Sequence, residues 1–208
     1  MKEIVLIGGG GHCKSVIEVI EGAKEFKIAG IVDIEDKKVL GYPYLGGDDD
    51  LEKLVKEYSC FHLTIGHMKS PSLRIKLAEK VKSLGGIFPN IIAKNASVSN
   101  YTKLGEGNVF MQQVIVNADV KIGSFNIINT KSLIEHDSEI GDFNHVSTNV
   151  VLNGTCKVGS RNLIGSSTVF YNNVSIENDI LISAGSLIAK SIKEPGIYIT
   201  KPTLRKIK

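Results

Sequence analysis

The 208-residue chain has little of what marks disulfide-bonded, metal-binding or nucleic-acid-binding proteins. Its three cysteines, Cys13, Cys60 and Cys156, lie far apart in the sequence and match no metal-ligand spacing. We therefore expect no bound metal and reduced thiols, as in the cytoplasm. The net charge is only +3 and the basic residues are scattered, so no surface for nucleic acid or membrane is indicated.

Long hydrophobic runs are also absent from the sequence. The chain passes from Met1 directly into a short apolar segment, without a hydrophobic signal region. No apolar stretch approaches the roughly 20 residues that a membrane-spanning helix needs. The sequence thus predicts a cytoplasmic protein without a membrane span.

What the sequence does contain is a six-residue repeat in its second half. Seventeen consecutive positions spaced six residues apart, from Ile92 to Ile188, are all occupied by Ile, Val, Leu or Phe. This period fits neither the 3.6 residues of an α-helix nor the two residues of a β-strand. It predicts a solenoid in which each hexad supplies one short strand and one turn, with the aliphatic side chain in a narrow stacked interior.

Small residues accompany the repeat at two positions. The fourth residue after each aliphatic residue is usually small, as at Asn108 and Ser132, because large side chains would crowd the corners. Gly often follows the aliphatic residue, as at Gly123 and Gly141, and we expect it to supply the backbone freedom of a tight corner. The frame never slips over residues 92–188, so we expect no inserted loop. A site on the coils must then be completed by the N-terminal domain or a neighbouring subunit.

The first ninety residues predict a small α/β domain. Short strands are expected at residues 4–7, 28–32 and 61–65. Helices are expected around residues 15–20, from the acidic cap at 48–50 to about 58, and over 71–84. Strands that alternate with helices form a parallel, Rossmann-like sheet. We therefore expect an α/β domain at residues 1–90, a solenoid at 91–190 and a C-terminal tail at 191–208.

A glycine loop joins the first predicted strand to the first helix. Gly8 and Gly10 begin a dinucleotide-binding fingerprint, but Cys13 stands where its third Gly belongs, while Asp33 lies about where the ribose-binding acid would be. The backbone N–H groups of such a turn can bind a phosphate, and the alternative is a tight turn needed only for folding. Because the sheet is small, a mononucleotide or a nucleotide-sugar is the expected ligand.

Two histidines fall in the middle of the repeat. His136 lies within Glu135-His136-Asp137, and His145 follows nine residues later. A packed aliphatic interior would reject His136, so we expect it to face a cleft or a neighbouring subunit. Asp137 can orient its imidazole and stabilise the protonated form, which a general base needs when an amine or hydroxyl attacks a thioester. The alternative is that both histidines are merely polar residues of the coils.

Together these motifs resemble one branch of the hexapeptide-repeat acyltransferases, the sialic acid O-acetyltransferase/sugar N-acetyltransferase family, which includes bacterial UDP-aminosugar acetyltransferases. The resemblance rests on Gly11-His12, on residues 135–137 and on the Gly-Asp-Phe-Asn-His segment at 141–145, and it covers nearly the whole chain. It implies an α/β domain followed by a left-handed parallel β-helix, assembled as a homotrimer. It also implies acetyl-CoA-dependent acetylation of a nucleotide-linked aminosugar in surface glycan biosynthesis, without a metal or a covalent acyl-enzyme.

The resemblance further implies roles for particular residues. His136 would be the general base, and Asp137 the acid that raises its basicity. The residues that would contact acetyl-CoA are His145, Gly154, Ser166 and Ala184. The residues that would bind the nucleotide sugar are Gly10, Gly11, His12, Asp33, Gly66 and His67, with Asp33 holding the base.

Other functions share parts of this pattern. An O-acetyltransferase for a sugar or sialic acid would use the same base, because a hydroxyl can replace the amine as nucleophile. A γ-type carbonic anhydrase would need three histidines on one zinc, and the repeats contain only two. A non-catalytic trimeric scaffold that binds sugar nucleotides would keep the hexads without needing the His136-Asp137 pair.

Overall fold

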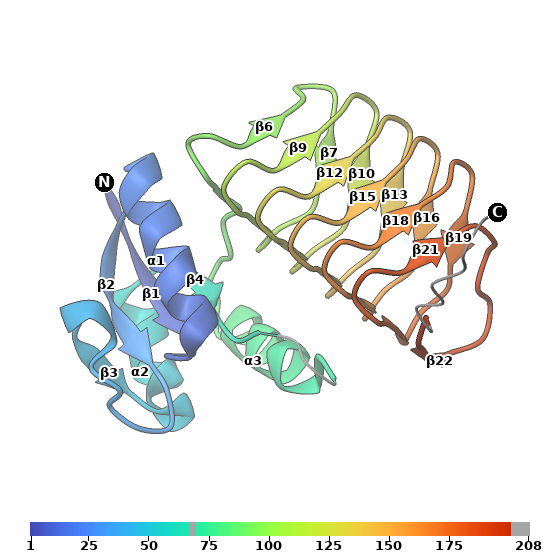
Figure 1. Ribbon diagram of the computed structural model, residues 1–208. Helices are drawn as coiled ribbons and strands as arrows, with labels where there is room; N and C mark the ends of the chain where they lie inside the picture. Colours follow the sequence, from blue (N-terminus) through green and yellow to red (C-terminus); the bar gives the residue numbers. More distant parts are fainter. Residues whose placement is uncertain (67–69, 201–208) are drawn as a thin grey trace, which may run out of the picture.

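The computed structural model describes residues 1–66 and 70–200, which form a small α/β domain beside a β-helix (Figure 1). The α/β domain has a four-stranded parallel sheet with the strand order β3-β2-β1-β4. Its strands are β1 (Lys2–Ile7), β2 (Phe26–Val32), β3 (Tyr44–Gly46) and β4 (Cys60–Leu63). Its helices are α1 (Gly11–Ala23), α2 (Leu51–Glu57) and α3 (Ser72–Ser83), with 3₁₀ turns η1 (Val39–Gly41) and η2 (Asp48–Asp50).

The predicted parallel α/β sheet is confirmed, and the structure adds one strand to it. The strand that the sequence did not predict is β3, which lies at the edge of the sheet and pairs only with β2. It has three residues, of which Tyr44 is exposed and Gly46 has a positive φ, so it lacks the apolar run by which the other strands were predicted. Among the described residues, no helix is both long enough and apolar enough to cross a membrane.

The second part of the chain is a β-helix built from strands that recur every six residues. The strands are β5 (Ile91–Ile92), β6 (Ser97–Val98), β7 (Lys103–Leu104), β8 (Val109–Phe110), β9 (Ile115–Val116), β10 (Lys121–Ile122), β11 (Ile127–Ile128), β12 (Leu133–Ile134), β13 (Glu139–Ile140), β14 (His145–Val146), β15 (Val151–Leu152), β16 (Lys157–Val158), β17 (Leu163–Ile164), β18 (Val169–Phe170), β19 (Ser175–Ile176), β20 (Ile180–Ile182), β21 (Leu187–Ile188) and β22 (Gly196–Tyr198).

Each strand pairs in parallel with strands about one coil away, so three hexads make one coil. Ile128, for example, is in register with Phe110 on the preceding coil and with Val146 on the following one. The strands form a five-stranded sheet (β19-β16-β13-β10-β7), a seven-stranded sheet (β22-β20-β17-β14-β11-β8-β5) and a six-stranded sheet (β21-β18-β15-β12-β9-β6). The seven-stranded sheet therefore continues into the segment expected as a C-terminal tail.

The corners of the β-helix are turned by residues other than the predicted glycines. A positive φ between 55° and 62° recurs every six residues at Gln113, Asp119, Phe125, Lys131, Asp137, Phe143, Asn149, Thr155, Arg161, Ser167, Asn173 and Asp179. Gly123 and Gly141 are not among the residues with a positive φ, so the prediction that they supply backbone freedom at corners was wrong. They are needed for space, because a Cβ on Gly123 would lie 2.8 Å from the carbonyl oxygen of Gly141 on the next coil.

The small residues of the repeat point into the interior and form a ladder of asparagines. Asn108, Asn126, Asn144 and Asn162 are fully buried and lie one above another on successive coils. The side-chain oxygen of Asn126 accepts hydrogen bonds from the backbone N–H of Asn144 at 2.8 Å and from its Nδ2 at 3.1 Å. The rungs at Asn108 and Asn126 repeat these bonds, whereas at Asn162 only the backbone N–H does so and Nδ2 has no partner among the described residues.

The α/β domain packs directly against the first coils (Figure 1). Phe125, at a corner of the β-helix, stacks on Phe143 with ring centroids 4.8 Å apart and contacts Phe88 edge-on at 5.1 Å. From α3, Arg74 Nη2 donates a hydrogen bond of 2.8 Å to the carbonyl oxygen of Phe125. This packing fixes the glycine loop and α3 relative to the coils that carry the two histidines.

Candidate active site

A cavity of about 620 Å³ lies between the glycine loop, α3 and the β-helix. The wall brings together residues from both parts of the chain. From the predicted nucleotide-sugar set it contains Gly10, Gly11, His12, Asp33 and Gly66, and from the β-helix it contains Asn129 and His145. His67, the remaining member of the predicted set, lies outside the described residues.

The glycine loop leaves the N-terminus of α1 open toward this cavity. Gly10 is the N-cap, no side chain caps the helix, and its first turn contains no acidic residue. Gly10 and Gly11 have no positive φ, and a Cβ on either would meet nothing within 4 Å. Folding therefore does not require glycine at these two positions, which favours close approach of a ligand over a purely structural turn. Free N–H groups and the helix dipole make this end attractive to an anion.

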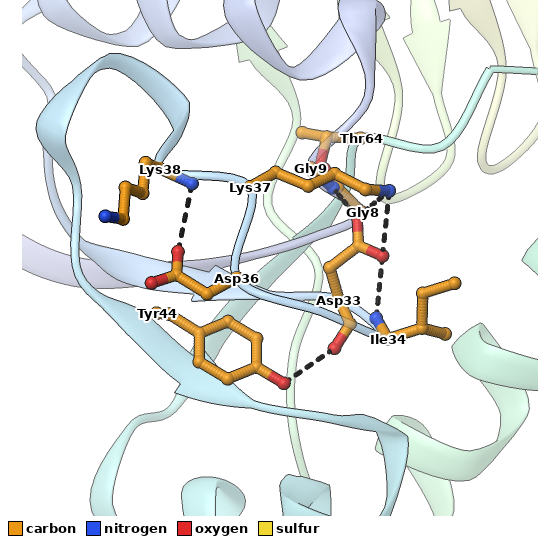
Figure 2. Close-up of polar contacts among 9 residues, drawn as sticks. All are labelled: Gly8, Gly9, Asp33, Ile34, Asp36, Lys37, Lys38, Tyr44 and Thr64. Atoms are coloured by element: carbon orange, nitrogen blue, oxygen red, sulfur yellow. Dashed lines mark hydrogen bonds and ion pairs between the residues drawn. The ribbon is translucent and has the colours of Figure 1, made fainter.

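Asp33 holds the glycine loop in place (Figure 2). Its carboxylate accepts hydrogen bonds from the backbone N–H of Gly9, from the N–H of Ile34 at 2.6 Å and from Lys37 Nζ at 3.1 Å. Burial acts to raise the pKa of Asp33, but the hydrogen bonds from Gly9, Lys37 and Ile34 outweigh it and lower that pKa below its usual value. Asp33 thus stays ionised and positions Lys37 at the cavity, while its predicted contact to the base stays a prediction.

His12 presents a neutral imidazole to the cavity. Burial, followed by the nearby His145, Arg74 and His62, lowers the pKa of His12 to about 3. Its Nε2 is buried and has no hydrogen-bond partner among the described residues. His12 therefore contributes shape to the cavity wall but no charge at neutral pH.

His136 and Asp137 form the contact that the sequence predicted. They lie at the corner after β12, and His136 Nδ1 is 2.7 Å from Asp137 Oδ2. Both side chains are exposed, at 60% and 56%. Gly154 lies next to His136 on the following coil, where a Cβ would come within 2.9 Å of His136 Nε2. The carboxylate engages Nδ1 and leaves Nε2 as the nitrogen that can take a proton.

The predicted base and the cavity lie on different faces of one chain. His136 follows the six-stranded sheet and is not among the residues that line the 620 Å³ cavity, whereas His145 belongs to the seven-stranded sheet and does line it. Of the other predicted acetyl-CoA contacts, Gly154 lies beside His136, while Ser166 and Ala184 lie on another corner, where Gly165 approaches Ala184. One chain therefore does not bring the predicted catalytic and cofactor residues together.

Several residues near the cavity were not predicted from the sequence. Asn129 lies in its wall with Nδ2 3.4 Å from His145 Nε2, and Lys37 lines it from the loop after β2. Arg74 is buried in α3 between two cavity-lining leucines. Asn129 could have been found by its register, because it follows β11 as Ser147 follows β14, and β14 carries the predicted His145. Nothing in the sequence marks Lys37 or Arg74.

No group of three or more His, Cys, Asp and Glu side chains suited to a metal ion occurs within residues 1–66 and 70–200. The three cysteines are free and buried. Burial raises the pKa of Cys13 to about 11, so its thiol is not a nucleophile at neutral pH. The cysteines therefore offer no nucleophile at neutral pH, and the His136-Asp137 pair remains the predicted catalytic group of the coils.

Comparison with known proteins identifies relatives for the whole chain. Residues 3–81 match the family described as the PglD N-terminal domain. UDP-N-acetylbacillosamine N-acetyltransferase from Bacillus subtilis is 30% identical over 116 residues, which is 53% of this chain and 52% of that protein, so this match spans about half of the curated relative.

Two solved structures match over nearly their full length. A histidine-to-asparagine mutant of perosamine N-acetyltransferase from Caulobacter crescentus, in complex with CoA and GDP-perosamine, is 33% identical with a TM-score of 0.91 and covers 100% of this chain and 98% of that one. The acetyltransferase domain of PglB from Neisseria gonorrhoeae, in complex with acetyl coenzyme A, is 25% identical with a TM-score of 0.90 and covers 97% of each chain. With its α/β domain and left-handed β-helix, the chain belongs to the hexapeptide-repeat family of sugar N-acetyltransferases.

Proposed function

We propose that this protein is an acetyl-CoA-dependent N-acetyltransferase that acts on a nucleotide-linked aminosugar in bacterial surface glycan biosynthesis. The observation that carries the proposal is the cavity of about 620 Å³ that joins an anion-attracting glycine loop to the histidine-bearing coils. Its volume falls within the usual range of roughly 300–1,000 Å³ for small-molecule sites. The Caulobacter relative binds CoA and GDP-perosamine, and both it and the Bacillus relative are named N-acetyltransferases, which favours an amine over a hydroxyl as acceptor.

The nucleotide sugar would occupy the cavity with its diphosphate at the glycine loop. The N–H groups of Gly10 and Gly11 and the positive end of α1 suit two phosphate groups. Gly66 and His12 are neighbours in the cavity wall, where a Cβ on Gly66 would lie 4.0 Å from His12 Cβ, so both would lie beside the same part of the ligand. The sugar then extends toward the β-helix, and Asp33 orients the base at the other end.

Acetyl transfer would be direct. As the amine attacks the thioester carbonyl, His136 Nε2 takes its proton, the new C–N bond forms, and the C–S bond breaks when the tetrahedral intermediate collapses. The proton passes from His136 to the departing CoA thiolate. Asp137, 2.7 Å from Nδ1, holds the ring in the required tautomer and stabilises the imidazolium.

The site would be shared between subunits of a homotrimer. Since His136 and the cavity lie on different faces, His136 of one copy must face the cavity of the next. A column of apolar side chains on the outside of the six-stranded sheet supports such packing, and it includes Ile115 and Leu187, which are 43% and 54% exposed. Acetyl-CoA would lie in the groove between neighbouring β-helices, in contact with His145, Gly154, Ser166 and Ala184.

The proposal is tested by assaying a panel of nucleotide aminosugars and free sialic acids with acetyl-CoA and following thiol release. We expect turnover of an aminosugar nucleotide, and a loss of on the order of 10²–10⁴ in kcat in His136→Ala, the usual contribution of a general base. Gln112→Ala, at the same hexad position four repeats earlier, serves as a control that keeps full activity. Wild-type turnover by His136→Ala would refute the base, turnover of sialic acid would favour O-acetylation, and binding without turnover would favour a scaffold.

A further inference from the structure

Arg74 is a buried cation without a counter-charge. Arg74 is 2% exposed, and its only hydrogen bond to the described residues runs from Nη2 to the carbonyl oxygen of Phe125. Its Nε and Nη1 have no partner, and it forms no ion pair with a carboxylate of the described residues. An unpaired buried charge is unfavourable for folding, so stabilisation of the fold does not explain why an arginine lies at position 74.

The groups around Arg74 do not cancel its charge. Burial, followed by the charge of Arg74, lowers the pKa of the buried His62 to about 3, and His12 is held neutral in the same way. Both imidazoles are therefore uncharged at neutral pH. Leu73 and Leu77, which flank Arg74 on α3, line the 620 Å³ cavity together with His12. Arg74 therefore belongs to the helix that forms this part of the wall, and its guanidinium is buried against Phe125 without lining the cavity itself.

The other cation at the cavity is compensated within the protein. Lys37 Nζ lies 3.1 Å from Asp33 Oδ2, so this pair contributes little net charge. The remaining positive potential comes from Arg74 and from the uncapped N-terminus of α1, and it is opposed by the carboxylate of Asp48, which also lines the cavity. Low-dielectric surroundings weaken the screening of a charge, so Arg74 acts on a ligand that it does not touch.

We infer that Arg74 is a positioning residue that retains the diphosphate group of a nucleotide ligand in the cavity. The inference rests on the proposed function only in taking the anion to be part of a nucleotide sugar. The charge remains without a protein partner because the diphosphate is its partner in the complex. Replacing a lone buried charge by an apolar residue of similar size removes the desolvation cost of that charge. Arg74→Met should therefore keep or raise the thermal stability of the free protein while weakening anion binding.

The test is calorimetric titration of the full chain with inorganic pyrophosphate, UDP and GDP at low salt. We expect the Kd of Arg74→Met for pyrophosphate and the bound nucleotide to rise roughly tenfold to a hundredfold, as for loss of a unit charge at short range in a partly shielded site. Arg74→Lys should lie between it and the wild type. Lys82→Met removes a charge from the same helix, where Lys82 pairs with Glu106, and should leave binding unchanged.

Kinetics separates this role from a structural one. With the nucleotide aminosugar that the panel assay identifies, Arg74→Met should raise KM for that substrate while kcat and KM for acetyl-CoA stay near their wild-type values. Three results would each overturn the inference. Arg74→Met could bind with wild-type affinity, or its loss of binding could be accompanied by a fall in its melting temperature. The third is that the wild type binds none of pyrophosphate, UDP and GDP. If Arg74→Met loses pyrophosphate binding but no aminosugar is acetylated, the inference stands and the proposed function fails.

Discussion

At the scale of single residues, Gly154 decides where the imidazole of His136 can lie. Gly154 is buried on the coil that follows His136 and has no positive φ, so the backbone conformation does not require glycine. The available space does require glycine, because a Cβ on Gly154 would lie 2.8 Å from His136 Cε1 and 2.9 Å from His136 Nε2. The spacing between two coils therefore positions the proposed base, and Gly154 contributes to that position in addition to its predicted contact with acetyl-CoA.

We predict that Gly154→Ala lowers kcat with little effect on folding. The added methyl group must displace the imidazole from its position against Asp137, and misplacement of a reacting group by about 1 Å can cost on the order of a hundredfold in rate. Steady-state kinetics with the acetylated aminosugar measures the loss. Gly22→Ala in α1, where a Cβ meets nothing within 4 Å, should keep wild-type kinetics. An unchanged kcat in Gly154→Ala would show that the ring position is not critical.

The His136-Asp137 contact could be predicted because the two residues are adjacent in sequence. Arg74 and Lys37 could not, because the place of each near the cavity depends on tertiary packing. The local sequence shows which adjacent residues can contact each other, but it does not show which distant residues tertiary packing brings together. Residues that act through tertiary contacts were therefore missed, although they surround the predicted glycine loop.

At the scale of elements, the asparagine ladder stabilises the register between coils. Each rung places a side-chain oxygen within hydrogen-bond distance of the next rung's backbone N–H, from Asn90 through Asn162. At the last rung, Asn162 Oδ1 accepts a hydrogen bond from Ile180 N–H, but Asn162 Nδ2 has no partner in the described part of the chain. The ladder thus ends where apolar residues replace asparagine.

We predict that Asn144→Ala destabilises the β-helix by about 2–4 kcal/mol, because it leaves buried backbone groups without partners. Asn144 Oδ1 accepts from Asn162 N–H at 2.8 Å, and Nδ2 donates to the Gly159 carbonyl at 2.8 Å. Urea unfolding followed by circular dichroism measures the change. Asn172→Ala, at an exposed corner, should change the free energy of unfolding by less than about 0.5 kcal/mol. Equal effects of the two substitutions would contradict the role of the ladder.

The elements themselves were largely predictable. The six-residue period over residues 92–188 fixes the positions of strands β5 to β21, so their register needs no tertiary information, whereas β22 lies beyond the repeat and was not predicted. The reason for the glycines was not predictable, because contact between Gly123 and Gly141 depends on the distance between coils. Strand β3 was missed because it too depends on tertiary structure. Its three residues form a strand only because β2 offers an unpaired edge.

At the scale of the whole molecule, the coil length separates the proposed base from the cavity. Nine residues between His136 and His145 are half of an 18-residue coil, so the two histidines lie on different sides of the β-helix. The sequence singled out both histidines, and it predicted that the N-terminal domain or a neighbouring subunit would complete the site. It did not predict which residues would share a face, because that depends on how the α/β domain covers the seven-stranded sheet.

We predict that two inactive variants restore activity when their subunits are mixed. His136→Ala lacks the base but keeps its cavity, whereas Gly10→Trp keeps His136 and fills the cavity, because Gly10 has open space where a side chain would project. If each site takes its cavity from one copy and His136 from the next, random mixing at equal amounts makes about one site in four intact, since both halves must come from the right variant. Thiol release from acetyl-CoA should then reach about a quarter of the wild-type rate after joint refolding, by the same symmetry. If cavity and base came from the same chain, every mixed assembly would stay inactive, because no subunit would carry both.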